Sequence, residues 1–253
     1  MNKKKKQSLT LRQTISIGLS ILFLITLSGA AKWANYRQTF DIFKINFYGY
    51  NILQKTDYEE ILSQFKVHSI YDFDLREIAE TIENNPFVRA AQISRQYPNK
   101  IRVNIVERKP LAIINLKEQL MIDGDAVILP NHHYINSLLI PILSGFNPEK
   151  DLYPHGEKTY SIKVRESVSI LNQLSDSFPN LYNNISELTL NNNDEYVIIL
   201  SDKPTRVILG KDNILKKLNI LKNFDKALGQ RQLTDFQLLD MRYNKQLIAR
   251  EWT

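Results

Sequence analysis

The feature that most constrains this chain is an uncharged apolar segment near its beginning. No charged residue occurs in the 19 positions from Gln13 to Ala31, which lie between Arg12 and Lys32. As a helix, this segment rises about 1.5 Å per residue and reaches roughly 28 Å, near the thickness of the hydrocarbon core of a bilayer. The sequence therefore predicts a membrane-spanning helix over residues 13–31.

The residues on either side of this segment predict its orientation. The first twelve positions hold five basic residues and no acidic one, and Trp33 and Tyr36 follow the apolar stretch. Positive charge favours retention in the cytoplasm, and aromatic side chains favour the membrane interface. We therefore expect a basic cytoplasmic tail over 1–12, a juxtamembrane linker over 32–40 and an exported body.

A cleaved signal peptide is the main alternative for the same segment. Residues 15–27 have the composition of an apolar signal core, and Ser28-Gly29-Ala30 supplies small residues for cleavage. A buried core helix is a third option, which the preceding lysine cluster disfavours. An anchor and a signal peptide both export the rest of the chain, so the predicted location of the body is the same.

The charge of the exported body argues against a nucleic-acid partner. Of 33 basic and 27 acidic side chains, seven basic and no acidic ones precede residue 41, which leaves 26 basic and 27 acidic residues in the body. A nucleic-acid-binding surface needs a folded basic patch that neutralises phosphates. The body lacks this excess, while 43% hydrophobic and 24% charged residues are typical of a globular protein.

The residue types that commonly carry chemistry form no catalytic pattern. The absence of cysteine excludes disulfides, thiolate metal sites and cysteine nucleophiles, and no glycine spacing matches a phosphate-binding loop. We interpret the histidines as loop residues, Asp74 as a helix cap and Asp123 as a turn residue. We therefore predict no catalytic residue, metal, cofactor or small-molecule substrate. The residues considered were His68, His132, His133, His155 and the pairs Asp72/Asp74 and Asp123/Asp125.

Residues 41–110 form a β-α-α-β-β pattern. A strand is predicted over 43–49, and capping boxes at Thr56 with Glu59 and at Asp74 with Glu77 each open a short amphipathic helix. Asn84-Asn85-Pro86 ends the second helix, because proline cannot continue it. Two strands follow, over 88–95 and 101–105, joined by a turn at 97–99. Ile78 is predicted to lie in the core of this module.

Residues 111–253 read as a larger α+β domain. Amphipathic helices are predicted over 161–178 and 213–228. Strands are predicted over 111–116, 119–129, 185–190, 196–200 and 205–209, with a closing hairpin over 236–243 and 246–252. We expect the two long helices to pack on one curved antiparallel sheet, which makes the fold class of the body α+β.

Several motifs occur in an order that is similar to one protein family. The run NPFVRAAQISRQYPNKI over 85–101 precedes Glu107-Arg108-Lys109-Pro110, and MIDG at 121–124, IPILSG at 140–145, VILG at 207–210 and LDMRY at 239–243 follow. In these motifs the chain resembles the FtsQ/DivIB cell-division proteins, whose first exported module is a POTRA domain. Phe87 stands where that family commonly has tryptophan. The resemblance covers nearly the whole chain.

The resemblance implies a non-catalytic scaffold of the bacterial divisome. It would have one span in the inner membrane as a type II protein, with its body outside the cytoplasm at the division septum. It would comprise a POTRA domain over 41–110 and an FtsQ-type β domain over 111–253. The implied partners are the FtsB/FtsL pair, through which it would control septal peptidoglycan synthesis, and other divisome proteins that contact the POTRA domain.

Two other classes of function are weighed against this one. A POTRA-containing component of outer-membrane protein transport would need a C-terminal barrel of repeated strands of about ten residues, whereas residues 111–253 carry two predicted long helices. A secreted protein behind a cleaved signal would be exported as well, but the body shows no catalytic constellation.

The final strand is the predicted partner-binding site. Only ten residues follow Tyr243, with a predicted turn at Asn244-Lys245, so little of this sequence remains to cover that strand. An uncovered strand edge presents unpaired N–H and C=O groups that a partner strand can satisfy. In the resembling family FtsB docks in this way, against a tyrosine that follows the D-L-R motif. The predicted contact residues are Tyr243, Arg242, Trp252, Arg250 and Ile248. The alternative is that Tyr243 packs across strands and Asp240 pairs internally with Arg242.

Overall fold

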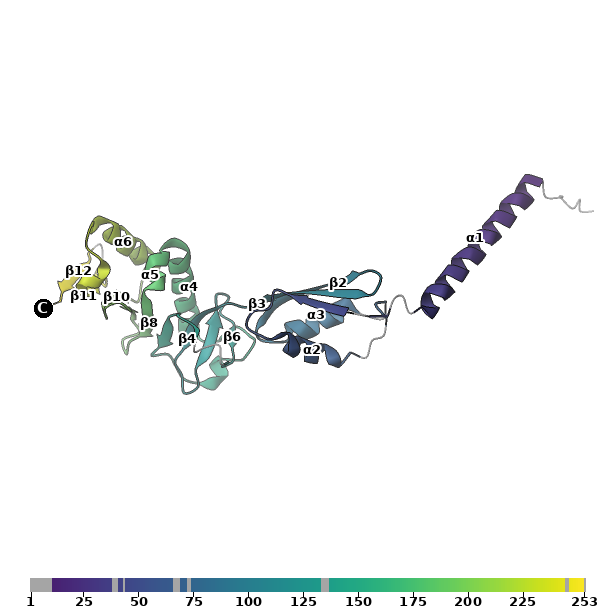
Figure 1. Ribbon diagram of the computed structural model, residues 1–253. Coiled ribbons are helices and arrows are strands. Elements are labelled where there is room, and N and C mark those ends of the chain that lie inside the picture. Colours follow the sequence, from purple (N-terminus) through teal and green to yellow (C-terminus); the bar gives the residue numbers. More distant parts are fainter. Residues whose placement is uncertain are drawn as a thin grey trace, which may run out of the picture.

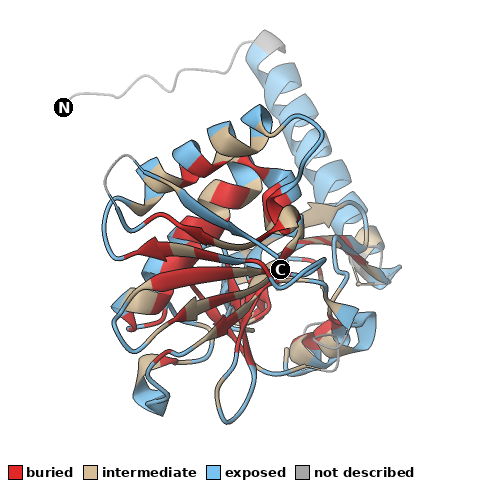
Figure 2. Ribbon diagram, turned by 90° about the vertical axis from the view of Figure 1, so that its left-hand side faces the viewer, coloured by how far each residue is buried: buried red, intermediate tan, exposed pale blue. Residues whose placement is uncertain are grey.

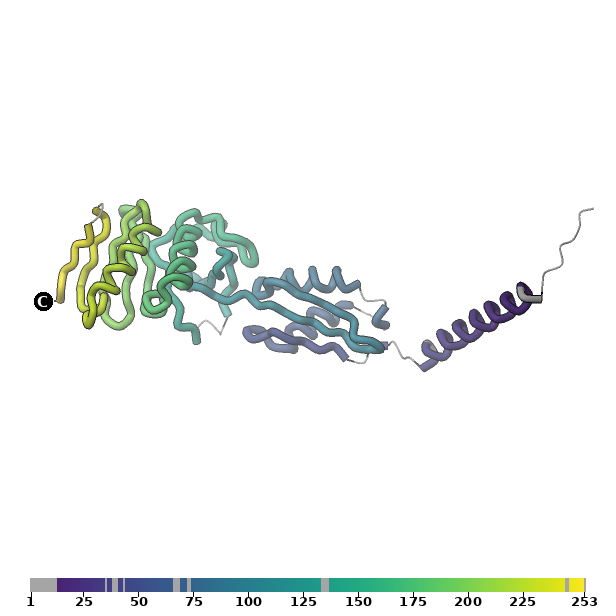
Figure 3. The backbone as a smooth tube through the Cα atoms, turned by 90° about the horizontal axis from the view of Figure 1, so that it is seen from above, coloured from purple at the N-terminus to yellow at the C-terminus, as the bar shows by residue number. Residues whose placement is uncertain are grey.

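The structure is a computed structural model that describes residues 11–37, 41–42, 44–65, 69–71, 74–132, 137–243 and 246–252. Its parts follow one another along an elongated body, with α1 at one end and the C-terminus at the other (Figures 1 and 3). Between them lie a three-stranded module and a nine-stranded domain. Some predicted features lie outside the described residues: the tail up to Thr10, His68, Asp72, His133 and the turn at Asn244-Lys245.

Helix α1 (Leu11–Tyr36) is long and apolar enough to cross a membrane over Gln13–Ala34. Its large apolar side chains are exposed, and none of this span is buried against the rest of the protein. A packed core helix, which was one alternative for this segment, does not fit that exposure. The length and apolar composition of α1 are those of a segment that can cross a membrane, which fits both an anchor and a signal sequence.

The three-stranded module contains β1 (Lys44–Tyr48), α2 (Lys55–Ser63), α3 (Leu75–Glu83), β2 (Val88–Gln96) and β3 (Lys100–Glu107). This β-α-α-β-β order confirms the predicted one. The sheet order is β1-β3-β2, with β1 parallel and β2 antiparallel to the central strand. Ile78 and Ile82 of α3 and Tyr58 of α2 are buried in its core, as the apolar spacing predicts.

One of the two predicted helix starts is wrong. Asp74 caps α3 as expected, because its carboxylate accepts the backbone N–H groups of Arg76 and Glu77. Helix α2 instead begins after Gln54, whose backbone N–H donates to the Asp57 carboxylate at 2.8 Å. Thr56 therefore lies inside the first turn of the helix, and Glu59 pairs with Lys55 on its exposed side.

Glu107, at the end of β3, holds the loop that precedes α2. Its carboxylate accepts backbone N–H groups from Asn51 and Ile52 at 2.6 Å and from Leu53 at 3.1 Å. It also accepts the hydroxyl of Tyr58 at 2.8 Å. Burial, and then this hydrogen bond, raise the pKa of the Tyr58 phenol. Hydrogen bonds to an ionised acceptor are stronger than neutral ones, so a single side chain fixes the path from β1 to α2.

The nine-stranded domain has the sheet order β12-β11-β10-β9-β8-β7-β4-β5-β6. Its strands are β4 (Pro110–Ile114), β5 (Leu120–Asp123), β6 (Ile128–Leu129), β7 (Ile142–Ser144), β8 (Ile185–Leu190), β9 (Tyr196–Leu200), β10 (Arg206–Gly210), β11 (Phe236–Asp240) and β12 (Ile248–Glu251). Its helices are α4 (Ile162–Ser177), α5 (Pro179–Asn183) and α6 (Ile214–Ala227), with short 3-10 turns η2 (Lys150–Leu152) and η3 (Leu233–Asp235).

This sheet is mixed rather than purely antiparallel, although the α+β class is confirmed. The pairs β4–β7, β7–β8 and β10–β11 are parallel. Parallel neighbours need a long crossover, and α4 with α5 supplies it between β7 and β8, while α6 supplies it between β10 and β11. Strand β7 and helix α5 were not predicted.

The predicted strand over 119–129 is also divided in two. It bends between β5 and β6 because the Asp123 carboxylate accepts the backbone N–H groups of Asp125 and Val127, and Ala126 adopts a φ of 63°. Asp123 is thus a turn residue, as predicted. The boundaries of α4 and α6 agree with the predicted helices, and Ser161 caps α4 by accepting the N–H of Val164.

The buried residues of the domain lie mainly between the sheet and the long helices (Figure 2). Strands β4, β5 and β6 are buried on both faces, because successive side chains point to opposite sides. Ile114, Ile122 and Ile128 join the core under α4, whereas Ile113, Met121 and Leu129 join the core of the three-stranded module. The module and the domain therefore share one continuous apolar contact.

Two ion pairs reinforce this junction. Arg108 follows β3, and its Nη1 donates to the buried Asp123 carboxylate at 2.8 Å. Arg89, at the start of β2, pairs with Asp125 at 3.0 Å. Both arginines come from the module and both carboxylates from the β5–β6 turn. Ion pairs as well as apolar contacts therefore hold the module and the domain together.

Candidate partner-binding edge

Strand β12 is an outer strand of the nine-stranded sheet, and its neighbour on the inner side is β11. The two strands are antiparallel, with Leu238 opposite Arg250 and Asp240 opposite Ile248. All four residues of β12 are exposed. The outer side of β12 has no strand beside it among the described residues, which is the arrangement that the sequence predicts.

The predicted contact residues lie in β12 and in the segments just before and after it. Tyr243 follows β11 and is 53% exposed. Ile248 and Arg250 alternate along β12 and therefore point to the same face. Trp252 follows the strand, and its Nε1 donates to the Thr234 carbonyl at 3.1 Å while part of the ring stays exposed.

Arg242 is tied to its own strand, as the internal-pairing alternative predicts. Its Nη2 lies 2.6 Å from Asp240 Oδ2, and its Nε lies 3.0 Å from Asp240 Oδ1. A second carboxylate, Glu195, lies 3.6 Å from Nη1. The Arg242 guanidinium lowers the pKa of Asp240, and the same hydrogen bonding raises the pKa of Arg242. This pairing holds Arg242 next to Tyr243 in one orientation.

No sequence pattern predicts the contacts that hold the far end of β12. Arg231 precedes η3, and its Nη2 pairs with Glu251 at 2.7 Å. The same guanidinium lies 4.6 Å from the ring centroid of Phe236 in β11. Arg231 lies 20 positions from Glu251 and 5 from Phe236, and no local motif marks either contact. Together with the Trp252–Thr234 hydrogen bond, they fix β12 while leaving its outer side open.

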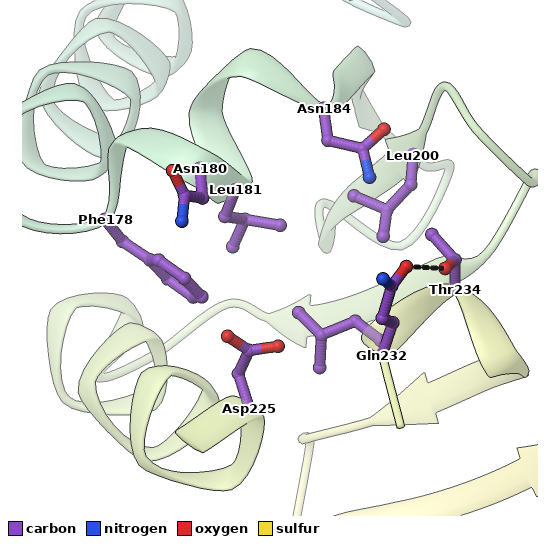
Figure 4. A pocket seen from close by; sticks show the side chains of 9 residues that line it. Phe178, Asn180, Leu181, Asn184, Leu200, Asp225, Gln232 and Thr234 are labelled. Carbon is purple, nitrogen blue, oxygen red and sulfur yellow. Dashed lines mark hydrogen bonds between the residues drawn. The ribbon is translucent and has the colours of Figure 1, made fainter. Parts of the chain in front are cut away.

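A cavity of about 240 Å³ lies beside this end of the sheet. Figure 4 shows its lining side chains, which include Asp225 from α6, Phe178 and Gln232, with Gln232 bonded to Thr234. Burial raises the pKa of Asp225. The volume is below the range of about 300–1,000 Å³ that is typical of small-molecule sites. Thr234 lines this cavity, and its backbone carbonyl accepts the hydrogen bond from Trp252.

Three of the described residues that were considered for chemistry, His132, Asp74 and Asp123, have structural contacts. The His132 ring packs against Phe87, with centroids 5.5 Å apart. Asp74 caps a helix, and Asp123 binds Arg108 and the backbone of its own turn. Within the described ranges, no group of three His, Cys, Asp or Glu side chains is placed to hold a metal ion.

Comparison with known proteins places both parts of the body. The family model described as POTRA domain, FtsQ-type, matches residues 40–108. The model described as Cell division protein FtsQ/DivIB, C-terminal, matches residues 112–242, which is more than half of the chain. The two matches meet at the junction that Arg108 and Asp123 bridge.

Individual relatives agree with these matches. The cell division protein FtsQ of Geotalea daltonii is 25% identical over 237 residues, which cover 90% of this chain and 84% of that protein. The cell division protein FtsQ of Syntrophotalea carbinolica is 25% identical over 176 residues, or 68% of this chain and 62% of the relative. The cell division protein DivIB of Clostridium tetani is 27% identical over 188 residues, covering 70% and 69% of the two chains.

Proposed function

Because the chain belongs to the FtsQ/DivIB family of cell division proteins, we propose that it is a single-pass, non-catalytic scaffold of the divisome. The basic tail over 1–12 lies in the cytoplasm, residues 13–31 span the membrane and 32–40 link them to the body. The POTRA domain over 41–110 and the C-terminal domain over 111–253 lie outside the cytoplasm. The protein acts at the septum by binding partners of the FtsB/FtsL type, and so controls septal peptidoglycan synthesis.

The open edge of β12 is the observation that carries this proposal. A strand edge presents a row of N–H and C=O groups, and leaving them available invites another chain to pair with them. A partner segment that adds a strand beside β12 gains backbone hydrogen bonds from this row. The exposed side chains Ile248 and Arg250 then supply contacts that distinguish one partner sequence from another.

Tyr243 is the proposed anchor of the interface. Exposed tyrosine and arginine side chains are over-represented among residues that dominate binding energy. Asp240 holds Arg242 in place beside it, so little side-chain freedom is lost there on binding. Trp252 is 38% exposed at the other end of the strand, while its Nε1 stays on the Thr234 carbonyl. The site is therefore largely formed before the partner arrives.

Affinity and stability measured on the same variant test this proposal. We expect Tyr243→Ala to weaken binding of an FtsB-type peptide by about 2 kcal/mol or more, roughly thirtyfold, without lowering the melting temperature. Tyr160→Ala is the matched control, because Tyr160 is similarly exposed at 59% and lies away from β12. A folded Tyr243→Ala protein that binds the peptide as tightly as the wild type would refute edge docking.

The cellular role needs a separate test. Depletion of the protein should give filamentous cells, and a fluorescent fusion should gather at midcell. Normal division after depletion would argue against a divisome role even if the peptide binds. POTRA-domain contacts with other division proteins would be mapped in the same cells by crosslinking from exposed positions of the module.

A further inference from the structure

One end of the three-stranded module is assembled from segments that are far apart in the sequence. β1 begins there, residues 69–71 from the connection between α2 and α3 lie there, and the turn between β2 and β3 lies there. Asp41 forms an isolated bridge with Ser69, Lys44 is opposite Lys100, and Arg95 Nε donates to the Ile70 carbonyl at 2.7 Å. The opposite end carries Glu107 and meets the nine-stranded domain, so this end faces the anchor (Figure 1).

Two tyrosine side chains project from the anchor-facing end. Tyr71 is 57% exposed and Tyr97, in the β2–β3 turn, is 65% exposed. Their ring centroids lie 6.2 Å apart, so the two rings form one exposed aromatic pair. A tyrosine side chain combines an apolar ring with a polar hydroxyl, which suits a membrane–water interface.

The length of the chain keeps this end close to the bilayer. Helix α1 ends at Tyr36, and Asp41 is five residues further on. A fully extended chain covers at most about 3.6 Å per residue, so Asp41 lies within roughly 18 Å of the helix end. The headgroup layer on each side of the hydrocarbon core is itself about 5–7 Å thick. The aromatic pair can therefore reach the lipid surface without any change in the module.

The charges around the pair are nearly balanced. The described basic side chains of this end are Lys44, Lys100, Arg95 and Arg76, and the described acidic ones are Asp41, Asp74 and Glu77. Attraction to anionic lipid grows with each surplus basic residue. The described residues of this end have a surplus of one basic side chain, so the rings rather than the charges would make the contact.

We propose that this end of the module rests on the lipid headgroup layer, with the rings of Tyr71 and Tyr97 at the membrane–water interface. The proposal assumes the anchoring of α1 that belongs to the proposed function. Tethering makes the contact intramolecular, at an effective concentration on the order of millimolar, so two aromatic side chains are enough to populate it. The contact sets the height and tilt of the module above the membrane.

A depth measurement on the full chain in nanodiscs tests the contact. The chain has no cysteine, so a single introduced cysteine carries a fluorophore at Asn99→Cys in the β2–β3 turn or at Asn84→Cys at the opposite end of the module. Lipids with a nitroxide on the headgroup quench a nearby fluorophore. We expect quenching at position 99 to be several-fold stronger than at position 84, in zwitterionic as well as anionic bilayers and at high salt.

Substitution of the two rings completes the test. Tyr71→Ser with Tyr97→Ser should reduce quenching at position 99 to the level of position 84, whereas Tyr71→Trp with Tyr97→Trp should retain it. Tyr160→Ser, at another exposed tyrosine, should change nothing. Equal quenching at the two positions of the wild type, or no effect of the serine variant, would overturn the proposal.

Two other outcomes would distinguish the proposed aromatic contact from a contact made by the basic residues and from a failure of the membrane anchor. A contact seen only in anionic bilayers would assign it to the basic residues and refute the role of the rings. A chain that carbonate extracts from membranes would refute the anchor, and hence the proposed function, before the contact is measured.

Discussion

The Tyr58 hydroxyl donates to the Glu107 carboxylate at 2.8 Å, across 49 positions of the chain. Glu107 belongs to the motif that closes the first module, and Tyr58 is a fully buried core residue of α2. The same carboxylate binds three successive backbone N–H groups. The contact explains in physical terms why an acidic residue stands at the end of β3.

Replacing Glu107 by Ala should lower the free energy of unfolding by about 2–4 kcal/mol. The substitution leaves the Tyr58 hydroxyl and the Leu53 N–H without their acceptor, and unsatisfied buried groups are costly. Urea unfolding of residues 41–253 measures the change. Glu80→Ala removes an exposed ion pair with Arg76 and should cost less than about 1 kcal/mol. Equal losses for the two variants would contradict the assigned role.

The Asp240–Arg242 pair should make stability depend on pH in the acid range. The guanidinium lowers the pKa of folded Asp240, so the unfolded chain binds a proton before the folded one does. The stabilisation is fully present above the unfolded value near 3.8 and is lost as the pH falls through the lower folded value. Asp240→Asn should therefore cost about 1–2 kcal/mol at neutral pH and progressively less below about pH 4.

Urea unfolding at a series of pH values measures this difference. The control is Asp202→Asn, since Asp202 is an exposed carboxylate in the β9–β10 turn. A difference between Asp240→Asn and wild type that stays constant with pH would show that the pair does not titrate as described.

Ile78→Ala should destabilise the three-stranded module by about 2–5 kcal/mol through lost burial and a cavity. Ile78 is only 1% exposed on the inner face of α3, as predicted. Arg102 in β3 is unsuitable as a surface control, because its side chain is half-buried over the Tyr48 ring at 4.9 Å. The exposed Gln92 in β2 is the better control, and Gln92→Ser should stay within roughly 0.5 kcal/mol. Thermal melts of both variants compare the two faces directly.

Leu22→Arg should disrupt the anchor. Leu22 lies near the middle of the span and is exposed, so a charge there would face lipid at a cost of roughly 2.5–3.5 kcal/mol of insertion free energy. A reporter fused after residue 40 and resistance to carbonate extraction give the readout, with Leu22→Phe as the apolar control. Release of the wild-type body into the soluble fraction would instead favour the cleaved signal peptide.

Local signals in the sequence predicted most elements of the fold. The cap at Asp74, the apolar spacing of α4 and α6, and the alternation in β3 are all short-range patterns. Strand β7 was not predicted, because its three residues form a strand through parallel pairing with β4 and β8, which lie far away in the chain. The start of α2 was predicted wrongly, because the cap at Gln54 uses its backbone N–H group and so does not depend on the type of side chain.

The candidate site likewise combines residues that the sequence predicted with contacts that it did not predict. Tyr243 and the strand after it stand out by sequence, and the structure places Tyr243 on the surface beside an outer strand. The pairing of Arg231 with Glu251 and the hold of Thr234 on Trp252 depend on how η3 packs beside β12. Such contacts follow from the tertiary arrangement, and no spacing rule predicts them.

The order of strands determines how far the β12 edge lies from the membrane. The module packs against β4, β5 and β6, while β12 lies at the opposite edge of the sheet, and the strands of the sheet run across the long axis (Figures 1 and 3). Eight spacings of about 4.8 Å separate the two edges by at most roughly 38 Å, and the eight residues of β3 add about 26 Å along the same axis. The sheet thus acts as a spacer. A partner anchored in the same membrane therefore needs a helical segment of up to about forty residues before its strand can meet β12.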